Sequence, residues 1–254
     1  MTQARRSLLV CVSVFTMITL YVASPSANHS WNGYHWARTV NPLTLSLGDN
    51  VSSVWDSHLD TASDDWSQST VLNTAVDGGQ AKGRNCRPPS GRVEVCNAAY
   101  GNNGWLGIAQ ISVSGKHITS GSVRLNDTYF DTPTYNTFAW RQLVVCQEVG
   151  HTFGLDHQDE NFDNANLGTC MDYTSDPSTN QHPNKHDYDE LQIIYAHLDS
   201  TTTAGAAARG AQGNPPDSPS EWGQLMKTTH GGKTQVFERD FGNGQKVVTF
   251  VIWA

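Results

Sequence analysis

The sequence predicts an α+β domain followed by a short β-rich tail. Three observations lead to this class. Apolar residues recur at three- and four-residue steps in three separate stretches, which is the period of an amphipathic helix. Short alternating runs separated by turn residues lie between the first two stretches, as expected of strands. Two further alternating runs flank Gly242-Asn243-Gly244, which predicts a hairpin near the C-terminus.

The first 27 residues predict a secretory signal. Arg5 and Arg6 precede an apolar run over residues 8–22 and a small-residue stretch over residues 23–27. This order is typical of a signal peptide, so we expect cleavage within residues 23–27 and a secreted, extracellular protein. An uncleaved signal anchor is the alternative. We expect no membrane span once the signal is removed.

The charge and the length exclude some function classes. The net charge is −8 over 254 residues and there is no basic run, so we expect no nucleic-acid partner. The chain is long enough for one sizeable domain with its own core. We expect it to be a monomer.

The cysteines outside the signal predict disulfides. Four remain when Cys11 is removed with the signal, and an even count in an exported chain favours two bonds. Of the three pairings, we predict Cys86–Cys96 and Cys146–Cys170, which close the shorter loops. A zinc site of four thiolates is the alternative, but no pair has the close spacing of such sites.

The N-terminal half predicts a strand, a helix and then several strands. Residues 41–50 form the strand. The helix follows, capped by Asp49 or Asn50, with an apolar face of Val51, Val54, Trp55, Leu59, Ala62 and Trp66. Between residues 91 and 129, the runs "RVEVC", "WLGIAQISV" and "HITSGSVRLN" predict strands.

The second half predicts two helices and the tail. A helix over residues 137–153 stops at Gly154, and a polar loop follows. A second helix covers residues 186–198, with Asp187 and Glu190 spaced as a capping box. Residues 200–219 have the composition of a linker. The tail, residues 220–254, carries the hairpin and is expected to pack on the main domain or on a partner.

The stretch "CQEVGHTFGLDHQDE" carries the chemistry. Gln147 and His151 lie one helical turn apart on one face, so both side chains can reach one metal ion. Glu148 lies beside them as a general base. Gly154 allows a sharp turn that returns His157 to the same point. Three protein ligands and an open position are the composition of a catalytic zinc site.

This stretch resembles the metzincin zinc-binding signature H-E-x-x-H-x-x-G-x-x-H at every fixed position except the first. "TCMDY", residues 169–173, is similar to the metzincin Met-turn. "PLTLSL", "DWSQSTVL", "GIAQIS", "SGSVRLND" and "DELQIIY" resemble matrixin segments in the same order, over most of residues 34–200.

The resemblance implies a fold, an activity and a set of roles. The fold would be a metzincin-like domain over residues 28–199, with a twisted mixed sheet, an active-site helix and a C-terminal helix. The activity would be a zinc metalloendopeptidase. His151 and His157 match metal ligands, Glu148 matches the general base, and Met171 matches the structural methionine of the Met-turn. A Cys146–Cys170 bond would then join the active-site helix to that turn.

The chain departs from the matrixin pattern at three places. Gln147 replaces a histidine: its amide oxygen could ligate the metal, Tyr173 or a water could complete the site instead, or the domain could be inactive. Tyr173 stands where matrixins carry proline and resembles the tyrosine that ligates metal or steadies an oxyanion in astacins and serralysins. No cysteine between the signal and Trp36 could cap the zinc.

The sequence therefore predicts a secreted metal-dependent endopeptidase. An extended peptide or protein substrate would pair with the backbone of residues 107–110, as with an edge strand. The alternative is an inactive, exported module that binds peptide or metal. Oxygen donors at Asp159, Asn161 and Asp163 could hold a structural calcium ion, although the loop lacks EF-hand spacing.

Overall fold

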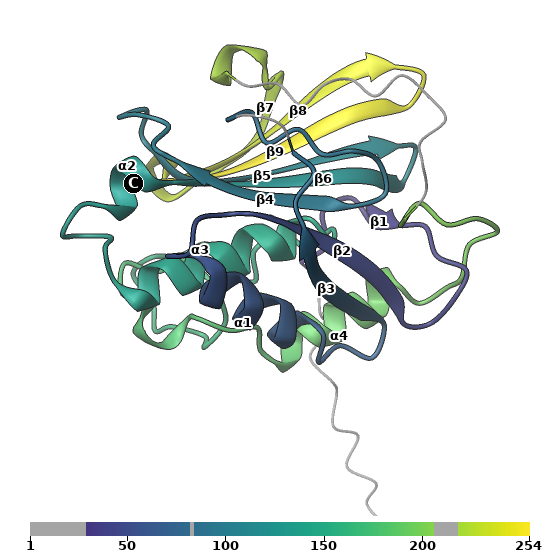
Figure 1. The fold of residues 1–254 in the computed structure, drawn as a ribbon, viewed down its shortest axis with the longest axis horizontal. Helices are drawn as coiled ribbons and strands as arrows, with labels where there is room; N and C mark the ends of the chain where they lie inside the picture. Colours follow the sequence, from purple (N-terminus) through teal and green to yellow (C-terminus); the bar gives the residue numbers. More distant parts are fainter. Residues whose placement is uncertain (1–28, 82–83, 206–217) are drawn as a thin grey trace, which may run out of the picture.

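The computed structural model describes residues 29–81, 84–205 and 218–254. The predicted signal peptide and most of the predicted linker lie outside these residues. The chain has a mixed α+β fold, as predicted, in which one twisted mixed sheet carries helices on one side (Figure 1). No helix in the described part of the chain has the length and apolar character needed to cross a membrane.

The sheet contains strands from both ends of the chain. Eight strands run in the order β3-β2-β4-β6-β5-β9-β8-β7, and β1 pairs with β6 outside this path. Their bounds are β1 His35–Trp36, β2 Leu43–Asn50, β3 Leu72–Gly78, β4 Val93–Ala98, β5 Trp105–Ser114, β6 His117–Asn126, β7 Gln224–Thr229, β8 Thr234–Gly242 and β9 Gln245–Trp253.

The direction of the strands changes in the middle of the sheet. β3, β2, β4 and β6 pair in parallel, while β6, β5, β9, β8 and β7 pair antiparallel. The parallel pair of β2 and β3 requires a crossover, which α1 supplies, whereas β5 and β6 are joined by a tight turn at Gly115. The C-terminal strands extend the antiparallel half, so the tail packs on the main domain.

The helices are α1 Asp56–Trp66, α2 Asp127–Phe130, α3 Phe138–His151 and α4 Lys185–Ile194, with 3-10 turns at Pro177–Thr179, Pro219–Glu221 and His230–Gly232. Figure 1 shows α1 and α3 together beneath the sheet. α1 packs against α3, and α3 packs against β5 and β6. The main core lies between these layers and includes Trp36, Trp66 and Phe153, all fully buried.

The predicted N-terminal caps of two helices are wrong. α1 begins at Asp56, because Asp49 and Asn50 are the last residues of β2, paired with β3 and β4, and so do not cap it. α4 begins at Lys185, and its capping box is Asn184 with Asp187, not Asp187 with Glu190. The Asn184 side chain accepts from the backbone N–H of Asp187, and Asp187 returns a bond to the N–H of Asn184.

Both predicted disulfides are present. Cys86–Cys96 joins the segment before β4 to that strand, and Cys146–Cys170 joins α3 to the segment before Met171. In both pairs the Cα atoms are 5.9 Å apart, within the ordinary range for the bond.

Candidate metal and catalytic centre

α3 positions the first part of the centre. The helix is capped by the Thr137 side chain, which accepts from the N–H of Trp140. Its last two turns are buried between the sheet and α1, and they carry Gln147, Glu148 and His151. Each of these polar side chains is at most 1% exposed, so each needs a partner or a ligand within the protein.

A sharp turn after α3 returns the chain to the same point. Gly154 has φ +97°, and a Cβ there would collide with the carbonyl oxygen of Tyr34, so only glycine fits. The turn brings His157 against His151, with their Nε2 atoms 2.9 Å apart. The structure thus brings together the two histidines that the motif predicts as metal ligands.

The other ring nitrogen of each histidine faces an oxygen. His151 Nδ1 lies 2.9 Å from the carbonyl oxygen of Leu155, and His157 Nδ1 lies 3.2 Å from Asp156 Oδ1. Burial alone would raise the pKa of Asp156, but hydrogen bonding to His157 and the charges of His157 and Lys227 outweigh it and lower the pKa. The carboxylate is therefore ionised, and its Oδ1 accepts from the backbone N–H of His157 at 2.9 Å.

His151 in its neutral form carries a hydrogen on Nδ1, because a carbonyl oxygen only accepts. Its Nε2 lone pair therefore points at Nε2 of His157. At 2.9 Å this lone pair accepts a hydrogen bond from Nε2 of His157, or the two nitrogens share a metal ion when both are deprotonated. Two nitrogens on a tetrahedral zinc ion lie about 3.3 Å apart, close to this separation, so the pair fits a metal.

Gln147 divides its amide between two roles. Its Nε2 donates to the carbonyl oxygen of Cys170 at 2.9 Å. Its Oε1 is buried and has no hydrogen-bond partner among the described residues. The atom that would ligate a metal is therefore the one that the protein leaves unused, whereas the amide nitrogen anchors the side chain to the turn beside Met171.

Glu148 lies under β5. A backbone hydrogen bond from Ala109 lowers its pKa, but burial dominates and raises the pKa well above the ordinary value. The second oxygen, Oε2, has no hydrogen-bond partner in the described parts of the chain. A Cβ on Gly107 would stand 2.8 Å from Glu148 Oε1 and 2.7 Å from Val144 Cγ1, so the close approach of strand and helix requires this glycine.

Met171 lies beneath α3. A Cβ on Gly150 would stand 2.7 Å from Met171 Sδ and equally close to the ring of Trp66. The methionine is fully buried, and its neighbour Cys170 is bonded to Cys146 of α3. The turn predicted to lie under the helix is thus held there by packing and by a covalent bond.

Tyr173 lies behind His157. Its hydroxyl is 3.0 Å from His157 Nδ1, and its ring stacks on Phe162 with centroids 5.1 Å apart. In this position the hydroxyl touches the nitrogen that faces away from His151. The Tyr173 hydroxyl therefore contacts Nδ1 of His157 and can orient its ring. A metal ligand would instead lie near the two Nε2 atoms.

The C-terminal strands close the centre. β9 pairs with β5 at the backbone predicted to receive substrate: Gly107 lies opposite Ile252, and Gln110 lies opposite Thr249. The prediction that this edge is free is therefore wrong for the described structure. The alternating run over residues 245–253 predicts a strand, but nothing in it identifies β5 as its neighbour.

Two side chains of these strands reach the histidines or their neighbours. Phe250 stacks on His151, with ring centroids 4.3 Å apart and planes 5° apart. Lys227 in β7 bonds Asp156 Oδ2 at 2.6 Å and Glu160 Oε1 at 2.5 Å. Neither residue was predicted from the sequence, because both lie at least 70 positions from the motif with no spacing that links them to it.

An apolar cleft of about 160 Å³ opens beside the centre. Its walls include Leu106 of β5, Trp140 of α3, Thr174 just after the Met171 turn, and Ile252 and Trp253 of β9. The loop that begins at Asp159 makes local bonds instead: Asp159 Oδ1 accepts from the N–H of Asn161. Calcium binding by this loop stays a prediction.

No protein-family model and no curated protein matches the chain. Two solved structures are similar to it. One is the structure of myroilysin, with 12% identity, covering 67% of this chain and 99% of that chain at a TM-score of 0.39. The other is high choriolytic enzyme 1, a hatching enzyme zinc-protease from Oryzias latipes (medaka fish), with 8% identity, covering 70% and 98% at a TM-score of 0.33. Similarity of this extent does not establish a shared function.

Proposed function

We propose that the chain is a secreted, metal-dependent endopeptidase of the metzincin type that uses zinc. The observation that carries the proposal is the His151–His157 pair: two Nε2 atoms 2.9 Å apart, with both Nδ1 atoms held by oxygens. The unused oxygen of Gln147 supplies a third donor on the same helix. Two imidazoles and an amide oxygen would bind zinc more weakly than three imidazoles.

The chain's own residues divide the work of peptide hydrolysis. A zinc ion held by His151, His157 and Gln147 would supply Lewis-acid chemistry, lowering the pKa of a water and polarising the peptide carbonyl. Glu148 takes the proton from the attacking water on its unpartnered Oε2 and later gives it to the leaving amine nitrogen. Asp156 and Tyr173 hold the ring of His157 in place.

The secreted location is supported by the two disulfides, which persist in oxidising compartments. The substrate would be an extended peptide, since β5 offers a backbone for pairing once its neighbour is displaced. An inactive binding module is the second candidate. It is favoured by the occupied β5 edge and by the bond from Gln147 to Cys170.

Zinc content and hydrolysis of a general protein substrate test the proposal. We expect Glu148→Gln to retain zinc and lose hydrolysis, because the carboxylate takes protons and does not bind the metal. Glu190→Gln, which changes a buried carboxylate on α4, is the matched control and should retain both. Because β9 covers the centre, each protein is also assayed with Phe250→Ala. If no hydrolysis depends on Glu148, either in the unchanged chain or with Phe250→Ala, the inactive binding module is the function that remains.

A further inference from the structure

A second group of histidines lies far along the chain from the motif. We call His35, His117, His197 and Asp199 the His35 cluster. His35 belongs to β1, His117 is the first residue of β6, and the last two residues follow α4. The cluster therefore joins the N-terminal segment, the sheet and the end of the main domain at one point.

The three imidazoles surround one carboxylate oxygen. The distances from Asp199 Oδ1 are 3.7 Å to His35 Nε2, 3.2 Å to His117 Nε2 and 3.5 Å to His197 Nε2. Two of the three exceed the usual hydrogen-bond limit of about 3.2 Å. Donor atoms on a tetrahedral zinc ion lie about 3.3 Å apart, so the distances fit a shared metal better than hydrogen bonds.

A neutral His35 side chain cannot donate to Asp199. Its Nδ1 lies 2.9 Å from the carbonyl oxygen of Gly33, which only accepts, so the hydrogen is on Nδ1 and Nε2 carries a lone pair. The side chain is 7% exposed, and Nε2 has no hydrogen-bond partner among the described residues. A buried lone pair aimed at a carboxylate oxygen requires a cation between the two atoms, either a proton or a metal ion. A carbonyl that fixes the outer nitrogen is also the usual support of a metal-binding histidine.

Asp199 is held with one oxygen turned to the histidines. Its Oδ2 accepts from the N–H of Arg38 at 2.9 Å, and its own N–H donates to the carbonyl of Arg38 at 2.7 Å. These bonds fix the carboxylate independently of the imidazoles and leave Oδ1 for the cluster.

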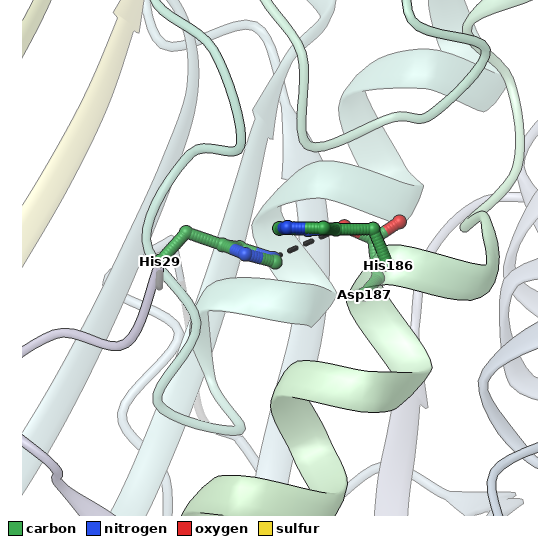
Figure 2. A group of neighbouring side chains, drawn as sticks. All are labelled: His29, His186 and Asp187. Carbon is green, nitrogen blue, oxygen red and sulfur yellow. Dashed lines mark hydrogen bonds and ion pairs between the residues drawn. The ribbon is translucent and has the colours of Figure 1, made fainter. Parts of the chain in front are cut away.

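The ring planes also converge. His35 meets His117 at 82° and His197 at 81°, with centroids 5.0 and 4.9 Å away, so the in-plane lone pairs approach one point from different directions. The group of His29, His186 and Asp187 differs (Figure 2): its two rings stack at 18°, and Asp187 already accepts from Thr169 and caps α4. In that group His29 pairs with Asp187, and the ring of His186 stacks on the ring of His29.

We propose that the His35 cluster binds one zinc ion through Nε2 of His35, Nε2 of His117 and Oδ1 of Asp199, whose donor atoms lie within 4.8 Å of one another, and that the exposed His197, 3.5 Å from the same oxygen, turns in as the fourth ligand. Four protein ligands and no open position make the site structural rather than catalytic. The His117 and His197 side chains are 38% and 56% exposed, so the ion enters from solvent. The bound ion fixes β1 and the segment after α4 to the start of β6.

Zinc content measured in a His151→Ala/His157→Ala background tests this site apart from the proposed catalytic one. We expect that background to keep one equivalent of zinc per chain, and His117→Ala to remove it. His182→Ala is the matched control, because this exposed histidine pairs with Asp65 outside the cluster. Added zinc should raise the Tm of the background protein and of the control but not of His117→Ala. His197→Ala repeats the test if His117→Ala does not fold. Equal zinc content in all variants would overturn the proposal.

The C-terminal strands carry a second inference, which rests on the proposed function. β9 bonds along β5 where an extended substrate would, Phe250 covers the ring of His151, and Lys227 holds the neighbours of His157. Glu148 and His151 are each 1% exposed beneath these strands. A peptide carbonyl therefore has no path to the histidines while the strands are in place.

We infer that residues 218–254 act as an intramolecular occupant of the substrate-pairing edge of β5 and keep the enzyme latent until they are displaced. Phe250 covers His151, and Lys227 holds Asp156 and Glu160 beside His157, so displacement of the strands uncovers both sides of the histidine pair at once.

Labelling of histidines with diethyl pyrocarbonate, read by peptide mass, tests the covering without requiring activity. We expect His151 and His157 to be protected in the intact chain, and Phe250→Asp to raise their labelling by roughly tenfold or more. Phe241→Asp, an exposed position on the same hairpin, should change nothing. Phe250→Ala serves as the milder variant if Phe250→Asp does not fold.

Labelling of His151 in the intact chain as fast as that of exposed His182 would overturn the latency inference. Protection that is lost in Phe250→Asp, together with new Glu148-dependent hydrolysis, would support it. Protection that is lost without hydrolysis would overturn the latent enzyme while leaving the strands as a cover, and the failure would then lie in the proposed function.

Discussion

The ring of Phe250 lies flat on the imidazole of His151, with planes 5° apart, and so joins the last strand of the chain to the candidate metal centre. Stacking covers a face of the imidazole but leaves its in-plane Nε2 turned toward His157. The C-terminal strand can therefore cover the centre without displacing a metal from it. Access of substrate and retention of metal are separable properties of this protein.

Gln147→His should tighten zinc binding. An imidazole nitrogen is a stronger zinc donor than the amide oxygen of glutamine, and the second ring nitrogen can replace the amide as donor to the carbonyl of Cys170. Competition with a chelator of known affinity measures the change. Gln142→His on the same helix is the control, and an unchanged affinity in Gln147→His would show that position 147 does not face the metal.

Gly107→Ala should lower both stability and hydrolysis. The added methyl group would stand 2.7 Å from Val144 Cγ1 and 2.8 Å from Glu148 Oε1, so strand and helix must separate or Glu148 must move. We expect a loss of about 1–3 kcal/mol in the free energy of unfolding, measured in urea. Gly78→Ala, at the end of β3 with no atom near the added methyl, should change it by less than about 0.5 kcal/mol.

The two disulfides should differ in their effect on the centre. Cys86–Cys96 closes a loop of 10 residues and Cys146–Cys170 one of 24 residues. Because the stabilisation grows only slowly with loop length, removal of either bond should lower the free energy of unfolding by a similar amount, about 3 kcal/mol. Only Cys146→Ala/Cys170→Ala should also weaken metal binding, because Cys170 positions Gln147 and Met171. Zinc affinity of both double variants, measured where each is folded, checks this; equal weakening in Cys86→Ala/Cys96→Ala would contradict it.

Stability should fall as the pH drops below about 6.5, in part through His58. Burial lowers the pKa of this imidazole, although its bond to Gln142 opposes the shift. The unfolded chain therefore takes up the proton first, so the contribution is complete above the unfolded pKa and is lost as the pH falls toward the folded one. His58→Phe keeps the packing and should show a shallower fall in urea unfolding between pH 7 and pH 5; parallel curves for the two proteins would refute the assignment.

Local sequence patterns predicted most of the helices and strands, but they could not predict which strands pair over long distances in the sequence. The alternation of residues 105–113 and 117–126 defines β5 and β6, and Gly242-Asn243-Gly244 defines the last hairpin turn. The partner of β9 could not be predicted, because an alternating run specifies a face and not a neighbour. α1 starts late because sheet pairing of Asp49 and Asn50 overrides their preference for capping.

The candidate sites also differ in whether they depend on local spacing or on long-range packing. The spacing of His151, Gly154 and His157 predicts their convergence, since it depends on one helix and one turn. The His35 cluster could not be predicted from the sequence, because its members are spread over 165 positions and form no motif. His197 and Asp199, in the run "HLD", are the only two members that lie close together in the sequence. They indicate a metal site only when β1 and β6 lie beside them.

The pairing of β9 with β5 has a further consequence for the solubility of the chain. Without β9, the run "WLGIAQISVS" would be a ten-residue strand with one unpaired backbone edge, and six of its residues are apolar. Such an edge invites pairing with a second copy and aggregation. Any process that displaces the C-terminal strands therefore exposes the chain to self-association, and a peptide that takes their place protects the same edge.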